Sequence, residues 1–425
     1  MRPYRPYRPY RRPPPSFKQR PMRKLALDVL FEWSKGEDYA AALIDEASHD
    51  CELSSRDTAL LQTLVYGVLR HRNLLDRWAE LLTDKKELDR ETLAALRLGL
   101  VQLLVLDMAP HAAVNETVEH AGRAGALVNA VLRRALREKD ALYAVRETAP
   151  LHIRFSQPDW LVRRWVKQFG ETEAAALCHW NQQPAPIYVR INRLMPKRPV
   201  FSFLDDHGDD FFSVESPPRE AIAAGACYVQ DPSTAMAPEL LNPTPSDSVL
   251  DVCAAPGGKT ALMAQMMRND GRITATDSSG KRLERMMGNL SRLGVNNVTS
   301  ITHDWIEKPG GPVENKKFDR ILLDVPCSNT GVIRRRVDVR WRLRESDFAE
   351  LAAVQFQLLM NSVGVLKPGG AIVYSTCSID AEENEQVVQK ALAAEPRLKL
   401  AETKQSLPHR DGLDGAYAAR LELSV

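Results

Sequence analysis

The chain has 425 residues, which exceeds one ordinary domain of about 150 residues and indicates two or three domains. With 44% hydrophobic and 26% charged residues it can bury a sizeable core, so extensive disorder is excluded. No segment approaches the ~18 apolar residues of a membrane helix, and the N-terminal sequence MRPYRPYRPYRRPPP lacks the apolar stretch of a secretory signal. Six cysteines without a CxxC pair favour buried or reactive thiols in a reducing cytoplasm over disulfides. We therefore expect a soluble, cytoplasmic protein.

The net charge of +2 is distributed unevenly along the chain. Within residues 1–20 every charged side chain is basic: Arg2, Arg5, Arg8, Arg11, Arg12, Lys18 and Arg20. The RPY repeat of this segment is rich in proline and charge and cannot bury enough surface to fold, so residues 1–21 are predicted to form a disordered arm. The arm either contacts RNA, with Arg on phosphates and Tyr on bases, or only aids solubility; the sequence leaves both roles open.

The pattern of apolar residues divides the rest of the chain into three further parts. In residues 22–146 apolar residues recur with the period of a helix, as in Leu60, Leu61, Leu64, Val65, Val68 and Leu69, which predicts an all-helical domain. Residues 147–246 mix a helix near 160–170 with a possible strand at 187–194, and predict a small α/β unit.

From residue 247 to 425, short apolar strands alternate with helices, which predicts a parallel sheet of βαβ units. Strands are expected at 248–254, 272–277, 298–303, 318–325 and 370–377, with helices at 260–267, 281–293 and 347–366. We expect a hairpin in the last stretch to close the sheet. The predicted fold class is therefore α/β, with a Rossmann-like domain preceded by an all-α domain.

Acidic residues follow several of the predicted strands, where an open parallel sheet binds its ligands. The first strand runs into DVCAAPGGKT (251–260), a glycine-rich turn that lets the backbone approach a ligand but lacks the first glycine of a phosphate-binding Walker loop. The second strand ends at Asp277, where a carboxylate can bind the ribose of an adenosine-bearing cofactor. Acids follow four successive strands, more than helix capping explains: Asp251, Asp277, Asp304 and Asp324.

Two cysteines also follow predicted strands, Cys327 in DVPC and Cys377 in STCS. The fourth and fifth strands are neighbours in common doubly wound sheets, so the thiols are expected on one edge, one or two strand spacings of ~4.8 Å apart. A lone cysteine is usually structural, which is our interpretation of Cys51, Cys178 and Cys227. No metal site is expected, because neither strand-end cysteine has a His or Cys partner close by in the sequence.

A thiol beside a nucleoside cofactor suits chemistry on an electrophilic ring carbon. Carbon 5 of a pyrimidine is too weak a nucleophile to take a methyl group directly. A thiolate that adds to carbon 6 creates an enamine whose carbon 5 can attack a sulfonium methyl, and loss of the C5 proton and of the thiolate releases the product. In this scheme Asp324 would hold N3 or the exocyclic amine of cytosine.

The motifs DVCAAPGGKT, LLDVPCSNTGVIRR and YSTCSI resemble those of the S-adenosylmethionine-dependent RNA cytosine-C5 methyltransferases. The segments LALDVLFEW, LVYGVLRHR and LVNAVLRR resemble the NusB-like RNA-binding domain of the bacterial small-subunit ribosomal RNA methyltransferase B (Sun/Fmu) group. The resemblance covers about residues 22–425. It implies S-adenosyl-L-methionine as cofactor, 16S ribosomal RNA as partner and cytosine-C5 methylation as the reaction.

The resemblance also implies roles for single residues. Cys377 would be the nucleophile, Cys327 would assist breakdown of the covalent adduct, and Lys259 would reach the substrate base beside Asp324. The cofactor site would be lined by Cys253, Ala254, Ala255, Pro256, Gly257, Gly258, Lys259, Asp277, Asp304 and Asp324. Val325, Val337 and Ala416 depart from the family pattern without removing a reacting group.

The run GVIRRRVDVRWRLR (331–344) is rich in arginine and predicts a surface that faces RNA, with Trp341 stacked on a base; a solvated loop is the alternative. The target cytosine must leave its stack to reach a buried thiol, so a single-stranded or looped site is expected. Two other functions stay open: the same chemistry on transfer RNA, and a non-catalytic RNA-binding or antitermination factor, against which the cysteines and acids argue. We expect a monomer without membrane contact; the target cytosine and the assembly state of the substrate stay undetermined.

Overall fold

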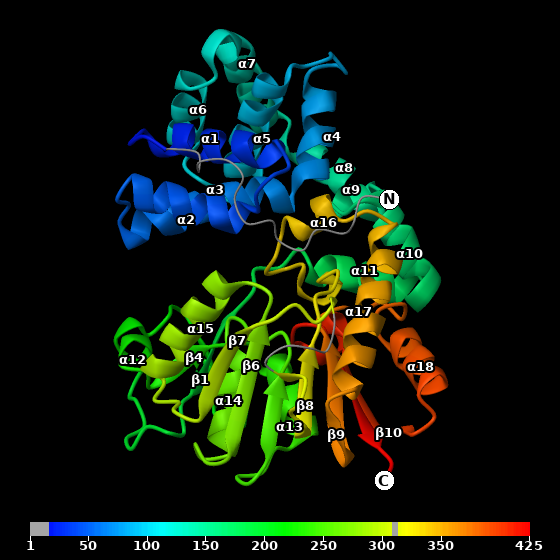
Figure 1. Cartoon of the computed structure of the whole chain (residues 1–425). Helices are drawn as coiled ribbons and strands as arrows, with labels where there is room; N and C mark the ends of the chain where they lie inside the picture. Colours follow the sequence, from blue (N-terminus) through cyan, green and yellow to red (C-terminus); the bar gives the residue numbers. More distant parts are fainter. Residues whose placement is uncertain (1–16, 308–312) are drawn as a thin grey trace. The chain divides into compact units, whose positions relative to one another are not determined.

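The computed structural model describes residues 17–307 and 313–425, which divide into two compact units (Figure 1). A helical unit contains the described residues up to 183 together with 333–343. A sheet unit contains 184–332 and 344–425. Residues 1–16 of the predicted arm lie outside the described residues, and the four-part division made from the sequence stays a prediction. Within the described ranges, no helix is long and apolar enough to cross a membrane.

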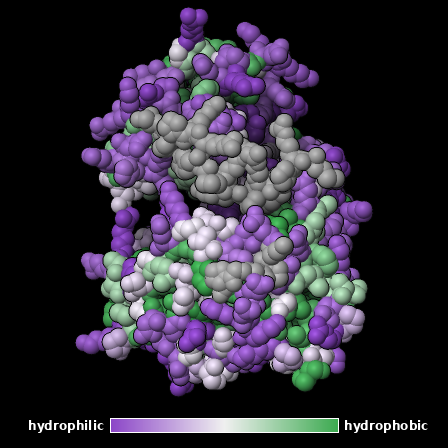
Figure 2. Space-filling view, viewed as in Figure 1, coloured by the Kyte–Doolittle hydropathy of each residue, from purple (hydrophilic) through white to green (hydrophobic). Residues whose placement is uncertain are grey.

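The helical unit confirms the all-helical prediction for the N-terminal part. In α3 the predicted apolar positions Leu61, Leu64, Val65 and Val68 are buried, and the Ser54 side chain caps the helix by accepting from the backbone N–H of Asp57. On the face that Figure 2 shows, the visible described residues of this unit are largely hydrophilic, as expected where helices turn their apolar side inward. Its helices are α1 (Met22–Ser34), α2 (Ala40–Asp50), α3 (Ser55–Arg70), α4 (Arg72–Leu82), α5 (Arg90–Leu104), α6 (Pro110–Glu119), α7 (Gly125–Arg137), α8 (Lys139–Thr148), α9 (Leu151–Arg154), α10 (Asp159–Phe169) and α11 (Glu171–Trp180).

The segment 333–343, which includes α16 (Val339–Arg342), packs into the helical unit. The fully buried Arg340 guanidinium donates to the carbonyl oxygens of Ser156 at 3.1 Å and Asn181 at 2.9 Å. Trp341 Nε1 donates to the carbonyl oxygen of Leu69 at 2.8 Å. The prediction that this run faces RNA is therefore wrong for Arg340 and Trp341, because carbonyls at helix ends, which lack intrahelical partners, accept their N–H groups.

Asp338 of the same segment accepts hydrogen bonds at the N-terminus of a helix. Its Oδ2 accepts from the backbone N–H of Ala40, the first residue of α2, at 2.7 Å, and from Trp33 Nε1 at 3.2 Å. A carboxylate at this position neutralises unpaired N–H groups and the partial positive charge of the helix N-terminus. Residues 333–343 thus supply both kinds of partner to the helical unit: N–H donors for carbonyls at helix ends, and a carboxylate acceptor for the N-terminus of α2.

The sheet unit contains a seven-stranded, mostly parallel sheet with strand order β10-β11-β9-β8-β5-β6-β7. The five predicted strands are present, and the predicted C-terminal hairpin pairs β10 with β11, which lies antiparallel to β9. The Rossmann-like prediction is confirmed. The strands are β5 (Ser248–Asp251), β6 (Arg272–Asp277), β7 (Val298–Thr302), β8 (Phe318–Asp324), β9 (Leu366–Thr376), β10 (Leu398–Ser406) and β11 (Ala416–Leu423).

Helices cover both faces of this sheet (Figure 1), and the side chains of β8 alternate between them. Ile321 and Leu323 pack in one core with α17 and α18, whereas Leu322 packs in another with α13 and α14. This alternation buries both faces and explains why β8 is almost uniformly apolar after its first residues. The helices are α13 (Met236–Leu241), α14 (Gly258–Met266), α15 (Gly280–Arg292), α17 (Asp347–Val363), α18 (Glu385–Ala394) and the short α19 (Pro408–Asp411).

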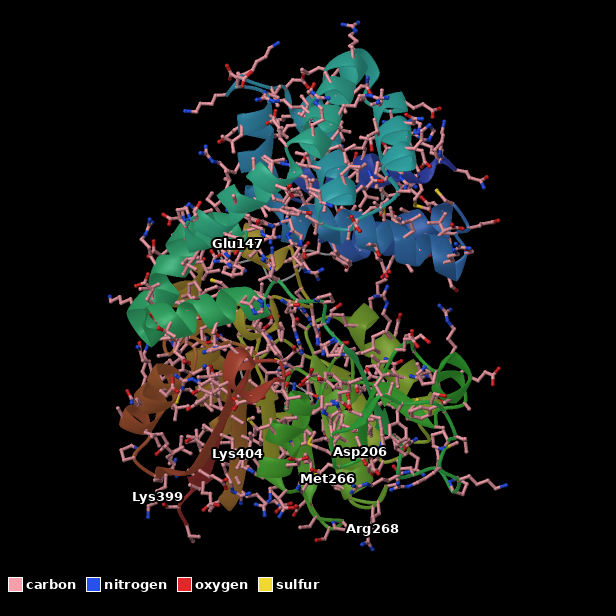
Figure 3. The ribbon with its side chains drawn as sticks, turned by 180° about the vertical axis from the view of Figure 1, so that it is seen from behind. Glu147, Asp206, Met266, Arg268, Lys399 and Lys404 are labelled. Atoms are coloured by element: carbon pink, nitrogen blue, oxygen red, sulfur yellow. The ribbon has the colours of Figure 1, made fainter. Side chains whose placement is uncertain are left out.

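Strand β10 forms one edge of the sheet and is exposed along most of its length. Lys399 and Lys404 both lie on it (Figure 3). Charged side chains on an edge strand oppose pairing with strands of other molecules. The sheet therefore ends in a strand that discourages aggregation.

A smaller antiparallel sheet precedes the large one, with strand order β2-β3-β1-β4. The possible strand predicted at 187–194 is confirmed as β1, and the helix predicted near 160–170 is α10 of the helical unit. The elements of this sheet are β1 (Ile187–Ile191), β2 (Asp205–Asp206), β3 (Phe211–Val214), α12 (Arg219–Ala223) and β4 (Cys227–Val229).

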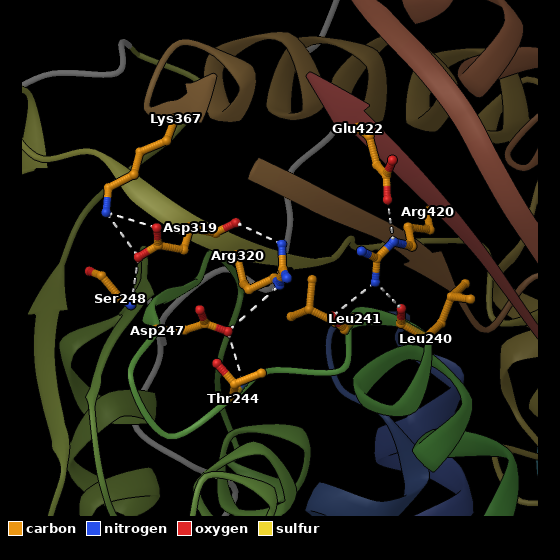
Figure 4. Close-up of polar contacts among 10 residues, drawn as sticks. All are labelled: Leu240, Leu241, Thr244, Asp247, Ser248, Asp319, Arg320, Lys367, Arg420 and Glu422. Carbon is orange, nitrogen blue, oxygen red and sulfur yellow. Dashed lines mark hydrogen bonds and ion pairs between the residues drawn. The ribbon is translucent and has the colours of Figure 1, made fainter. Parts of the chain in front are cut away.

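The amino ends of the parallel strands are joined by exposed and half-buried charges (Figure 4). Asp319 at the start of β8 accepts from the Ser248 backbone N–H at 2.9 Å and forms an ion pair with Lys367 at 2.8 Å. Arg420 of β11 donates to the carbonyl oxygens of Leu240 and Leu241 at 3.0 and 3.2 Å. These contacts tie the start of β8 to its neighbours and satisfy the carbonyls at the end of α13.

Candidate active site

The predicted functional residues gather at the carboxyl ends of the parallel strands. Strand β5 lies between β6 and β8, so the chain connections diverge there, which is where open parallel sheets bind their ligands. The turn after β5, Asp277 of β6, Asp324 of β8 and the cysteines after β8 and β9 all belong to this edge. The structure therefore brings the proposed catalytic and cofactor-binding groups to one side of the sheet.

The turn at 253–259 runs from β5 into α14 and packs closely against the sheet unit. Gly257 has φ of 99°, and a Cβ there would lie 2.7 Å from Met286 Cγ, so only glycine fits this backbone. The backbone N–H of Ala254 donates to the carbonyl oxygen of Thr276 at 2.9 Å, which fixes the start of the turn on β6. Burial raises the pKa of Cys253, the thiol in this turn.

Asp277 is nearly fully buried at the end of β6. Its Oδ1 accepts from the Ser279 backbone N–H at 3.0 Å, and its Oδ2 lies 3.1 Å from an Arg282 nitrogen. The Oδ2 atom nevertheless has no hydrogen bond of good geometry among the described residues. A buried carboxylate oxygen without a hydrogen bond is costly, so this position has the capacity to accept from a ligand hydroxyl.

Asp251 and Asp304, two further strand-end acids, differ from Asp277 and from each other. Burial raises the pKa of Asp251 to about 7, and the Thr260 hydroxyl donates to its Oδ2 at 2.7 Å, which turns it toward α14. Asp304 is exposed, and its Oδ1 accepts from the backbone N–H of Ile306 at 2.9 Å. Asp304 thus closes its own turn after β7.

Lys259 and Asp324 form an ion pair across the edge, with Nζ 2.7 Å from Oδ2. The Ser375 hydroxyl of β9 donates to Asp324 Oδ1 at 2.8 Å, so both carboxylate oxygens are held. Burial alone would lower the pKa of Lys259, but the charges of Asp324 and Cys377 outweigh it and raise the pKa. Lys259 therefore presents a firmly protonated amine at this edge.

The sulfur atoms of Cys327 and Cys377 lie 3.1 Å apart, closer than the predicted one or two strand spacings. Cys327 is buried, whereas Cys377 is half-buried and its sulfur lies 3.4 Å from Asn329 Oδ1. The hydrogen bond to Cys377 and burial together raise the pKa of Cys327 well above the ordinary range. Of the two thiols, Cys377 is the less buried and therefore the more accessible.

All six cysteines are free thiols, and Cys51, Cys178 and Cys227 are buried on other elements. The structural interpretation of these three thiols fits their burial. Burial raises the pKa of Cys227 to about 11, so it stays unreactive at neutral pH.

A buried polar network behind the two cysteines was missed from the sequence. It comprises Ser328, Thr330, Gln355, Thr376, Ser378, Asp380, Glu383 and Asn384, all buried. The segment SIDAEENE (378–385) offered a clue, because so many polar residues directly after an apolar strand are unusual in a solvated loop. Its significance depends on burial, which the sequence pattern does not reveal.

A Rossmann-like sheet with a glycine-rich turn, a buried carboxylate and a thiol pair at one edge is typical of a methyltransferase-type domain, which here accompanies a helical unit. Residues 238–422 match the 16S rRNA methyltransferase RsmB/F family, 20–137 match the NusB family, and 157–202 match the ferredoxin-like domain of RsmF/B-like methyltransferases. Two curated relatives cover most of the chain.

The chain is 31% identical to a probable ribosomal RNA small subunit methyltransferase B of Bacillus subtilis, covering 94% of this chain and 98% of that protein. It is 36% identical to the ribosomal RNA small subunit methyltransferase B of Klebsiella pneumoniae, covering 87% and 91%. The chain therefore belongs to the RsmB family of 16S rRNA methyltransferases and is an enzyme.

Solved structures support the same fold. The crystal structure of PH0851 superposes with a TM-score of 0.74 at 24% identity, covering 96% of this chain and 100% of that chain. A methyltransferase homolog protein from Pyrococcus horikoshii superposes with a TM-score of 0.56 at 29% identity, covering 64% and 97%.

Proposed function

We propose that the enzyme transfers a methyl group from S-adenosyl-L-methionine to carbon 5 of a cytosine in 16S ribosomal RNA, through a covalent adduct between Cys377 and carbon 6. The observation that carries the proposal is the pair of sulfur atoms 3.1 Å apart beside the turn after β5. The names of the relatives, ribosomal RNA small subunit methyltransferase B, support ribosomal RNA as the substrate class.

The first step belongs to Cys377. Its thiolate adds to carbon 6 of the cytosine, the sulfur–carbon bond forms, and the electron pair of the C5–C6 double bond makes carbon 5 nucleophilic. Cys327, protonated because of its raised pKa, stabilises this thiolate by a hydrogen bond. Lys259 and Asp324 hold the polar edge of the base, the lysine near its carbonyl and the aspartate near N3 or the amine.

The residues of the turn and the strand ends fit the cofactor. The buried Oδ2 of Asp277 has room for a hydrogen bond that a ribose hydroxyl would donate, and the turn 253–259 is built to approach a ligand closely. When bound, S-adenosyl-L-methionine supplies the electrophilic methyl group. Asp304 would contribute from the loop after β7.

The last step releases the product. Water takes the C5 proton, the electrons of the C5–H bond form the C5–C6 double bond again, and the sulfur–carbon bond breaks so that Cys377 leaves as the thiolate. Cys327 assists this elimination, because its protonated sulfur lies beside Cys377 and donates a hydrogen bond to the departing thiolate. The helical unit contributes RNA binding, and the enzyme acts as a monomer in the cytoplasm.

The covalent mechanism is tested by replacing each thiol and running the enzyme–RNA mixture on a denaturing gel. Cys377→Ala should abolish methyl transfer and every covalent enzyme–RNA species. Cys327→Ala should form the adduct but release it poorly, so a covalent band should accumulate. Cys227→Ala is the matched control and should behave as the parent enzyme. Trapping by Cys377→Ala instead would reverse the two roles, and trapping by neither would contradict the covalent mechanism.

The substrate is tested by bisulfite mapping of total RNA from cells with and without the gene. A 5-methylcytosine in 16S ribosomal RNA that disappears with the gene is expected. Loss of a transfer RNA modification with intact ribosomal RNA would move the same chemistry to the other substrate.

A further inference from the structure

The loop that carries Cys327 is held from behind by one buried carboxyl group. Glu383 Oε1 accepts from the backbone N–H of Ser328 at 2.9 Å, and its Oε2 accepts from the Ser328 hydroxyl. Gln355 Nε2 donates to Glu383 Oε1 at 2.9 Å and also to the carbonyl oxygen of Pro326 at 3.0 Å. The residues on both sides of Cys327 are therefore fixed by Glu383 and its neighbour Gln355.

Because Glu383 is buried, its carboxyl oxygens need hydrogen-bond partners. The residue is 0% exposed, and burial raises its pKa although donors from Ser328 and Ser378 lower it. A buried carboxyl group destabilises a protein unless its oxygens are satisfied, and a satisfied network tends to specify a single geometry. Such a group is well suited to hold a loop in one position.

A second set of contacts fastens the same loop to the residues after β9. Gly331 N–H donates to the carbonyl oxygen of Cys377 at 2.9 Å, and a Cβ on Gly331 would lie 2.7 Å from that oxygen. The Thr330 hydroxyl donates to Asp380 Oδ2 at 2.6 Å and accepts from the Ile379 backbone N–H at 3.2 Å. The two cysteine loops are thus joined directly by hydrogen bonds on this side.

Cys377 is positioned differently from Cys327. It directly follows β9, which is paired with β8 on one side and β11 on the other up to Thr376. Loss of the Glu383 contacts therefore leaves the backbone before Cys377 in place, whereas Cys327 follows its strand by a longer, non-strand connection.

We propose that Glu383 is a positioning residue that places the Cys327 thiol against Cys377 and so controls release of the methylated RNA. The inference rests on the proposed covalent mechanism and deepens it. Since attack requires Cys377 and release requires Cys327, disturbing Glu383 should slow release far more than attack.

The test compares Glu383→Gln with the parent enzyme and with Cys327→Ala, using full-length protein, S-adenosyl-L-methionine and substrate RNA on a denaturing gel. The Gln side chain keeps one acceptor for the Ser328 N–H but cannot accept from the Ser328 hydroxyl. We expect a covalent band at least about tenfold above the parent level, the size of effect of a lost hydrogen bond to a charged group. The rate at which the band forms should stay near the parent rate.

Ser328→Ala is the second variant, since it removes the hydroxyl with its contacts to Glu383, Thr330 and Ser378 and leaves the backbone N–H bond to Glu383. It should accumulate the same band to a smaller extent. Glu385→Gln, a half-buried acid two positions along the chain, is the matched control and should behave as the parent enzyme. A merely structural role would lower all activity in proportion to unfolding and would not create a covalent band.

The outcomes separate the two proposals. If Cys327→Ala traps RNA and neither Glu383→Gln nor Ser328→Ala does, the role of Glu383 is wrong while the covalent mechanism stands. If Cys327→Ala itself traps nothing, the release step and the role of Glu383 both fail. If Glu383→Gln does not fold, the band formed by Ser328→Ala decides whether Glu383 controls release.

Discussion

A lysine–aspartate ion pair lies at each end of strand β8, and the nitrogen–oxygen distances of the two pairs are nearly the same. At the carboxyl end Lys259 and Asp324 lie 2.7 Å apart, and at the amino end Lys367 and Asp319 lie 2.8 Å apart (Figure 4). The Lys259 side chain is 21% exposed and that of Lys367 is 42% exposed. The distance between the charges therefore does not distinguish the two ends.

The surroundings do distinguish them. Asp324 shares its edge with Ser375, the turn 253–259 and the thiol pair, whereas Asp319, which is equally exposed at 33%, has the Ser248 backbone N–H. Burial would raise the pKa of Asp319, but hydrogen bonds from Lys367 and Ser248 outweigh it and lower the pKa. The ion pair at the amino end is thus typical of an ordinary surface contact, whereas the ion pair at the carboxyl end is typical of a functional site.

The largest difference between the two ends should appear in activity. Lys259→Met should reduce methyl transfer by about 10- to 100-fold, because a charge-assisted hydrogen bond at the substrate is lost and Asp324 loses its partner. Lys367→Met should leave turnover unchanged and alter the free energy of unfolding by no more than about 1 kcal/mol, as for exposed ion pairs. Single-turnover methylation and urea unfolding measure these effects. Equal losses of activity in both variants would remove the distinction.

Cofactor binding should separate the ends next. Asp277→Ala should weaken S-adenosyl-L-methionine binding by about 1.5–3 kcal/mol, the range for a hydrogen bond to a charged group. Asp247→Ala, at the amino end beside Arg320, should bind the cofactor as the parent does. Isothermal calorimetry checks both, and unchanged affinity in Asp277→Ala would contradict the ribose assignment.

The pH dependence of stability should also have opposite signs at the two ends of the parallel strands. The pKa of Asp251 is raised to about 7, so the folded state binds its proton more tightly and the contribution of Asp251 to stability falls as the pH rises from about 4 to 7. The pKa of Asp319 is lowered, so its contribution is present above the unfolded pKa and is lost as the pH falls through the folded pKa. Urea unfolding of Asp251→Asn between about pH 4 and 7, and of Asp319→Asn below about pH 4, measures the two effects. Parallel pH profiles would contradict the comparison.

The sequence predicted which functional side chains lie at the strand ends, but it predicted few of the hydrogen bonds that position them. Strand 272–277 was predicted at its observed bounds, because apolar alternation and the parallel-sheet rule depend on local pattern. Cys327, Cys377 and Asp324 were found because strand ends are where such sheets bind ligands.

Two features could not be predicted from the sequence, for a physical reason. Glu383 lies in a polar run whose composition is typical of a solvated loop, and its burial depends on packing between segments distant in the chain. Arg340 and Trp341 were assigned to RNA because of their charge and ring, whereas helix-end carbonyls from α3 and α11 take their donors. Residue type alone does not reveal which acceptor a donor finds.

The segment 333–343 makes the helical unit discontinuous in the gene. A fragment ending at residue 183 would lack Arg340, Trp341 and Asp338, and would leave the carbonyls of Leu69 and Asn181 and the start of α2 without these partners. The helical unit, which contains the part that matches the NusB family, is therefore not encoded by one continuous stretch. A gene fusion that transfers the whole helical unit would also have to carry residues 333–343, which begin just after Cys327 in the same reading frame.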